Sequence, residues 1–163
     1  MIEQLRRMLK EHLVSEKERR DDEWWELQLA TATLLMEVAR ADERITEDER
    51  RDISRLIGKH YSLAPELTLR IAAAAERQAQ DATSLYPFTR LINRSCSPEE
   101  KVRLVSMLWQ VTCSDGHVDK YEEHLVRKIA ELLHVPHREF IRMKLKAFNG
   151  DTKENPRAAP DGV

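Results

Sequence analysis

The sequence predicts an all-α protein, a compact bundle of about seven or eight helices. Three observations support this fold class. Only four glycines occur in 163 residues, whereas strands joined by tight turns normally need more. Alternating runs of β-branched residues are missing, and apolar residues recur instead at helical spacing. The composition, 41% hydrophobic and 34% charged, is that of a globular domain with one well-formed core.

The charge distribution limits the classes of partner. The net charge is −2, but residues 21–52 hold eleven acids and only four arginines. This block attracts cations and would repel a phosphate backbone, so we expect no nucleic-acid partner. No run reaches the roughly 18 apolar residues that cross a bilayer, and residues 1–20 lack the apolar centre of a signal peptide. We therefore expect a cytoplasmic protein in which Cys96 and Cys113 are reduced core residues.

The chain divides into three predicted segments, an amphipathic helix over 1–20, a helical domain over 21–148 and a disordered tail over 149–163. The first helix is expected to dock on its own domain, with membrane-surface or partner binding as the alternative. The charged run 16–23 is expected to break or hinge it. Its apolar face carries Ile2, Leu5, Met8, Leu9 and Leu13.

The helical domain opens with a helix–loop–helix unit. After Trp24 and Trp25, which together with Trp109 we expect in the core, an apolar stripe predicts a helix that ends near Ala41. A second helix begins after Thr46, because Thr46-x-x-Glu49 is a capping-box sequence. Apolar residues at helical spacing continue it at Ile53, Leu56 and Ile57.

Two helices are predicted in the middle of the chain. Pro65 suits the first turn of a helix that runs to about Asp81. A shorter helix is expected over 83–96, with Pro87 in its first turn, where a missing N–H is tolerated.

A second helix–loop–helix unit follows. Ser97 and Pro98 supply an N-cap and a first-turn proline, and two acids follow them at the positive end of the helix. This central helix stops at a loop that begins with Asp115, and Asp119-x-x-Glu122 resembles the capping arrangement of the next helix. A last amphipathic helix is expected after Pro136.

The two loops are related by a shift of 73 positions, which places Asp42 on Asp115 and Glu49 on Glu122. We predict two units related by a pseudo-two-fold duplication, because neither unit alone could bury its apolar face. The core positions that the shift also aligns are Leu35 with Leu108, Val38 with Val111, Ile45 with Val118, Ile53 with Val126 and Leu56 with Ile129.

The second loop matches the later half of an EF-hand calcium loop, Asp-Gly-x-aliphatic-x-x-x-Glu. The earlier half is absent, since Val111 and Cys113 would occupy its first and third positions. Ca²⁺ prefers about six to eight oxygen ligands, and one loop offers fewer. A site therefore needs waters or ligands from elsewhere. The expected ion is Ca²⁺ or Mg²⁺. The candidate metal ligands are Asp42, Glu49, Asp115, Asp119 and Glu122.

The same acids also have a purely structural interpretation, which spacing alone favours. Glu49 and Glu122 stand where a capping box places a glutamate, and Asp42 and Asp115 suit a turn after a helix. Zinc is disfavoured because no CxxC or HxxxH spacing occurs. No nucleophile motif, phosphate-binding glycine loop or HExxH sequence is present, so we expect neither an enzyme nor a further cofactor.

The two loops, the segment Leu85–Asn93 and the junction Ala39–Asp42 resemble the TerB family, the tellurite resistance protein B-like domains, over roughly residues 20–148. The resemblance implies a compact, all-helical, pseudo-symmetric bacterial domain without known catalysis. It also implies a link to tellurite and related stress responses and to metal-linked or membrane-associated partners. The acidic positions of the family correspond to Asp42, Glu49, Asp115 and Glu122. Glu43 replaces the usual glycine, so we expect a distorted first turn and weaker ion binding there.

We therefore expect a non-enzymatic binding module whose loops hold a divalent cation and whose adjacent helix faces engage a protein partner. The alternative is a metal-free structural adaptor that docks on a protein partner or on the membrane surface.

Overall fold

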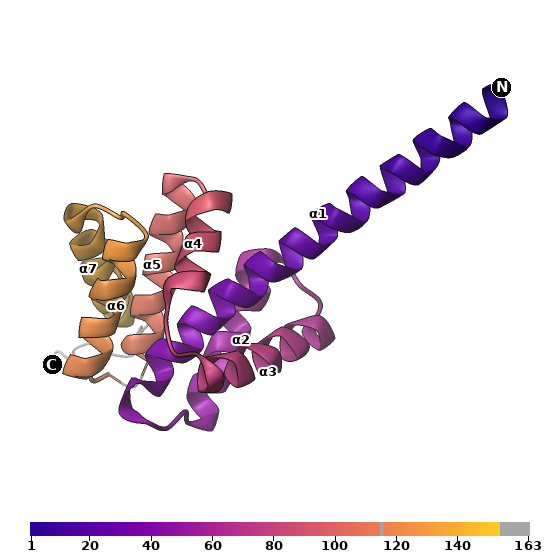
Figure 1. Ribbon diagram of the computed structural model, residues 1–163. Helices are drawn as coiled ribbons and strands as arrows, with labels where there is room; N and C mark the ends of the chain where they lie inside the picture. Colours follow the sequence, from indigo (N-terminus) through magenta and orange to yellow (C-terminus); the bar gives the residue numbers. More distant parts are fainter. Residues whose placement is uncertain (115, 154–163) are drawn as a thin grey trace, which may run out of the picture.

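The computed structural model describes residues 1–114 and 116–153. Within them the chain is helical and contains no strand, which confirms the all-α prediction (Figure 1). None of these helices is both long and apolar enough to cross a membrane. The elements in chain order are α1 (Ile2–Ala39), the 3₁₀ turn η1 (Arg40–Asp42), α2 (Glu47–Tyr61), α3 (Pro65–Asp81), α4 (Tyr86–Ser95), α5 (Pro98–Thr112), α6 (Lys120–Leu132) and α7 (His137–Lys153).

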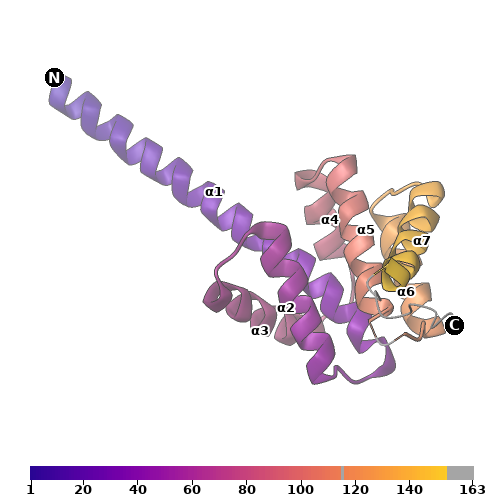
Figure 2. The same cartoon turned by 180° about the vertical axis from the view of Figure 1, so that it is seen from behind.

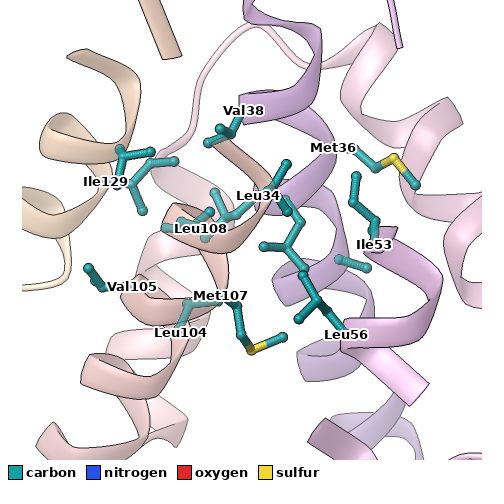
Figure 3. Close-up of a cluster of buried hydrophobic side chains, with 14 of the residues drawn as sticks. Leu34, Met36, Val38, Ile53, Leu56, Leu104, Val105, Met107, Leu108 and Ile129 are labelled. Carbon is teal, nitrogen blue, oxygen red and sulfur yellow. The ribbon is translucent and has the colours of Figure 1, made fainter. Parts of the chain in front are cut away.

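The C-terminal part of α1 is the centre of the bundle. From Leu27 to Ala39 nearly all of its residues are buried, and this part contacts α2, α3, α4, α5 and α6. Figure 3 shows Leu34 of α1 between Leu108 of α5 and the side chains of α2. The close-up labels other buried residues of this core, namely Met36, Val38, Ile53, Leu56, Leu104, Val105, Met107 and Ile129.

The N-terminal half of α1 departs from two expectations. The helix is continuous through residues 16–23, so the predicted break is wrong. This run contains neither glycine nor proline, and its glutamates, lysine and arginines are good helix formers. The segment also does not dock on its own domain, because it projects away from the bundle in Figures 1 and 2. Trp24 and Trp25, expected in the core, are 52% and 37% exposed.

Local capping chemistry starts three helices where the sequence placed them. Thr46 at α2 and Ser97 at α5 each form a complete capping box with the glutamate three residues on. Asp119 also caps α6. Its carboxylate accepts from the backbone N–H of Tyr121 at 2.9 Å, and this cap takes the place of the predicted capping box with Glu122. The acids at these starts lie at the positive ends of the helix dipoles.

The last helix covers part of the predicted tail. Helix α7 continues to Lys153, five residues past the expected end at 148, and residues 154–163 lie outside the described part. Phe140 of α7 packs on Trp109 of α5 with ring centroids 5.0 Å apart. Trp109 is fully buried, as expected.

Candidate metal centre

Three carboxylates from three separate elements meet at one end of the bundle. Asp42 belongs to η1, Glu49 to the first turn of α2 and Glu122 to the first turn of α6. Each offers one oxygen, and these oxygens all lie within 4.8 Å of one another. The contact between η1 and α6 brings Glu122 to residues more than seventy positions earlier in the chain. The cluster is therefore made by the tertiary fold, since neither loop alone supplies it.

The chain reverses direction at Glu43, and this turn brings Asp42 and Glu49 close together. Glu43 has a left-handed backbone, φ 73°, and its N–H donates to the carbonyl of Arg40 at 2.8 Å. The Asp42 carboxylate accepts from the backbone N–H of Arg44 at 3.3 Å, which closes the turn. These bonds keep Asp42 beside the start of α2.

Glu49 is held in the same place by its capping box. Its backbone N–H donates to Thr46 Oγ1 at 3.2 Å, and its Oε2 accepts from the N–H of Thr46 at 3.2 Å. The cap orients the carboxylate toward the loop. The structural and metal interpretations of Glu49 are therefore compatible, because a capping oxygen can also be a ligand.

Glu122 is the buried member of the cluster, with 8% of its surface exposed. A carboxylate removed from water near two others experiences repulsion that a cation would relieve. Two arginines close in sequence to Asp42 and Glu49 make contacts outside the cluster. Arg40 donates to the carbonyl of Ala79 at 2.6 Å, and Arg50 pairs with Glu76 at 2.8 Å.

The donor set fits a hard divalent cation. Carboxylate oxygens are the ligands preferred by Ca²⁺ and Mg²⁺, and the cluster contains no sulfur or imidazole donor that would favour zinc. Opposite ligands of Ca²⁺ stand about 4.6–5.2 Å apart, twice the usual Ca–O distance, so one ion fits within the observed spread. The same upper bound also admits Mg²⁺, whose opposite ligands stand about 4.0–4.2 Å apart. Waters or backbone carbonyls would complete either shell.

Of the other two predicted ligands, one does not belong to this cluster and one lies outside the described residues. Asp119 uses its carboxylate to cap α6 and is not among the three grouped acids. Asp115 lies outside the described residues. The sequence pattern did not predict that the carboxylate of Glu122 lies beside those of Asp42 and Glu49. One signal was available, because Glu122 shares a helix face with Val126 and Ile129, and an acid in line with core residues is unusual.

The two loops share local backbone features. Under the 73-residue shift, the ends of α1 and α5 correspond, as do the starts of α2 and α6. Glu43 has φ 73° and the corresponding Gly116 has φ 79°. The expected distortion of the first turn is therefore wrong, since Glu43 adopts the conformation that glycine has in the second. The pseudo-two-fold relation between the whole units stays a prediction.

Glycine at position 43 should stabilise the protein. A non-glycine residue in the left-handed region costs about 1–2 kcal/mol, and the flexibility of glycine in the unfolded chain offsets part of this. We expect Glu43→Gly to raise the free energy of unfolding by up to about 1 kcal/mol, measured by urea denaturation. The neighbouring Arg44→Gly is the control and should lower it. A loss of stability in both variants would contradict the strain argument.

One comparison with known proteins identifies a family for this chain. A family model described as tellurite resistance protein TerB matches residues 28–145. No match was found among curated proteins or among solved structures. The matched segment begins where α1 enters the bundle and includes all three clustered carboxylates. The chain therefore belongs to the TerB family.

Proposed function

We propose that this TerB domain is a non-enzymatic module that holds one divalent cation, Ca²⁺ or Mg²⁺, between its two loops. Asp42, Glu49 and Glu122 would be the protein ligands. The convergence of these three carboxylates, one of them buried, carries the proposal. Family membership supports a role in tellurite resistance or a related stress response. As a further part of the proposal, the module acts in the cytoplasm through a protein partner.

A cation at this position would act as a cross-link. The ligands come from η1, α2 and α6, and so a bound ion would join the first loop to the start of α6. The N-termini of α2 and α6 favour negative charge, and so they suit carboxylate ligands at these positions. Loss of the ion would leave three carboxylates in repulsion and loosen this end of the bundle.

Thermal unfolding of chelator-treated protein tests this role. Because an ion that binds only the native state stabilises it by mass action, we expect the midpoint to rise with Ca²⁺ or Mg²⁺ concentration. At one hundred times the dissociation constant the gain would be about 2.7 kcal/mol. Zn²⁺ at equal concentration should give a smaller shift, since the ligands are all carboxylates. Midpoints that do not respond to any of these ions would remove the metal from the proposal.

The second candidate function is a metal-free structural adaptor. One observation favours it, namely that Glu49 already serves in a complete capping box. In that case the acids only stabilise helix starts, and the surface of the bundle or of α1 docks on a partner or on the membrane. Removing a capping side chain would then cost about 1 kcal/mol, and added metal would not change this cost.

A further inference from the structure

The part of α1 outside the bundle is exposed along almost its whole length. We define residues 2–26 as the α1 extension, and Figure 2 shows it leaving the bundle as a single straight helix. Every one of these residues is exposed except Glu16, which is half-buried. Its outer part, residues 2–14, carries large exposed apolar side chains: Ile2 70%, Leu5 61%, Met8 68%, Leu9 54%, Leu13 60% and Val14 50%.

These side chains form part of one continuous helix face. Ile2, Leu5, Leu9 and Leu13 follow each other at spacings of three and four residues. The same spacing continues through charged residues to Leu27, which is the first buried residue of α1. The face that enters the core at Leu27 is therefore the face that lies uncovered farther out. A helix with such an uncovered apolar stripe gains stability by burying it.

A pocket of about 470 Å³ lies at the base of the extension, on this face. Leu27 belongs to the stripe and also lines the pocket, so the two features share one side of the helix. Trp24 stands at the rim, 52% exposed, with its ring edge-on to Tyr61 at 5.4 Å. Ile92, Cys96 and Leu104 complete the apolar part of the lining, and the polar part consists of Thr31, His60, Ser62, Glu100 and Arg103.

Charge is distributed unevenly along the extension. Residues 1–14 carry three bases against two acids. Residues 15–26 carry six acids against three bases. Two such helices attract each other in antiparallel orientation and repel each other in parallel orientation.

We propose that the α1 extension binds the same segment of a second copy in antiparallel orientation. The outer part of each helix would lie on the base of the other, and Ile2 would reach the partner copy's pocket beside Trp24. The pairing places Leu9 of one copy opposite Arg20 of the other, and the two helices contact each other over a length of roughly 37 Å. An overlap of the outer parts alone would span only roughly 20 Å and would leave both pockets open.

The alignment also predicts which charges meet. At 100° per residue, Arg6, Lys10 and Asp21 lie along one edge of the helix face. In an antiparallel pair with two-fold symmetry, this edge of one helix faces the same edge of the other helix. Asp21 of one copy then lies between Arg6 and Lys10 of the other. The extension itself precedes residue 28, where the family match begins.

A membrane surface is the competing occupant, and the charge pattern disfavours it. Glu3 and Glu11 interrupt the basic residues of the outer part, and the acidic base follows within a few turns. An interfacial helix normally carries a more uniformly basic polar face. Binding to anionic lipid is therefore an outcome of the test and not part of the proposal.

The first experiment is cysteine cross-linking of the full chain with Cys96→Ala in every variant. The double variant Leu9→Cys/Arg20→Cys should form a covalent dimer on oxidation. Leu9→Cys alone and Arg20→Cys alone should not, because eleven residues place like positions roughly 16 Å apart, beyond disulfide reach. Cross-linking of Leu9→Cys alone would indicate a parallel pair and would overturn the proposal.

The second experiment uses sedimentation and light scattering to measure the mass of the protein in solution. It also measures how dimer formation depends on salt and on the charges of the extension. The native chain should have the mass of two copies, and added salt should weaken the dimer. Arg6→Glu/Lys10→Glu should weaken it at least about tenfold, and Asp21→Lys added to these should restore it to within about threefold. All three positions are exposed, so folding is unaffected. A monomer at all concentrations, with or without binding to phosphatidylglycerol vesicles, would overturn the proposal.

Discussion

Glu122→Gln should raise the thermal midpoint of chelator-treated protein and lower the midpoint of protein saturated with Ca²⁺. The opposite signs follow from the cluster geometry. Without an ion, the buried Glu122 carboxylate lies within 4.8 Å of two others, and neutralising it removes repulsion. With an ion, the same change removes a charged ligand. Glutamine keeps the size of the side chain, so packing is little changed.

The expected magnitudes are within reach of ordinary calorimetry. Two like charges at this separation repel by up to about 3–4 kcal/mol at an effective dielectric constant of 20. The lost interaction of Glu122 with the start of α6 offsets about 1 kcal/mol or less. A net gain of about 1 kcal/mol raises the midpoint by about 2–4 °C in a protein of this size. Loss of the ligand should weaken Ca²⁺ binding by at least about tenfold, about 1.4 kcal/mol.

The capping interpretation predicts a different result for the same variant. If Glu122 only stabilises the start of α6, glutamine should cost at most about 1 kcal/mol, equally with and without metal. Glu131→Gln is a matched control, because it makes the same charge change at an exposed position of α6. It should shift neither midpoint by more than about 1–2 °C. A lower midpoint for Glu122→Gln in both conditions would support the adaptor over the metal module.

The sequence predicted the helix starts well because capping is local chemistry. Thr46 and Ser97 each need only the residues that follow them to begin a helix. The continuity of α1 was missed for a related reason. The charged run 16–23 lacks apolar periodicity, which suggests a break, but nothing in the run opposes a helical backbone. Apolar periodicity indicates that one face of a helix is buried, and a helical segment that projects into solvent does not need it.

The candidate site shows where local reasoning ends. Asp42, Glu49 and Glu122 were all predicted as ligands, but in two separate loops. Their meeting depends on how η1 packs against α6, which no local pattern encodes. Trp24 shows the same limitation. The sequence predicts Trp24 in the core because it precedes an apolar helix, yet the buried part of α1 begins one turn later, at Leu27.

The largest loss of stability is expected at Trp109. Its side chain is fully buried between α5 and α7, and its Nε1–H donates to the carbonyl of Phe140 at 3.2 Å. Its ring also contacts the Phe140 ring and lies 5.4 Å from the Lys144 ammonium. Truncation to alanine opens a cavity where the two helices meet, and we expect Trp109→Ala to cost about 3–5 kcal/mol in urea denaturation. Trp25→Ala, outside the bundle, should cost less than about 0.5 kcal/mol.

Trp109→Phe separates packing from hydrogen bonding at the same position. Phenylalanine keeps most of the ring contact with Phe140 but cannot donate to its carbonyl, so the cost should fall to about 1–2 kcal/mol. Trp109 is not among the clustered carboxylates, so a Ca²⁺-induced rise in midpoint should be retained in this variant. A fully retained rise would show that ion binding stabilises the two loops without requiring native packing of α7. A reduced rise would mean that the contact between α5 and α7 also positions Glu122, through α6, which touches both helices.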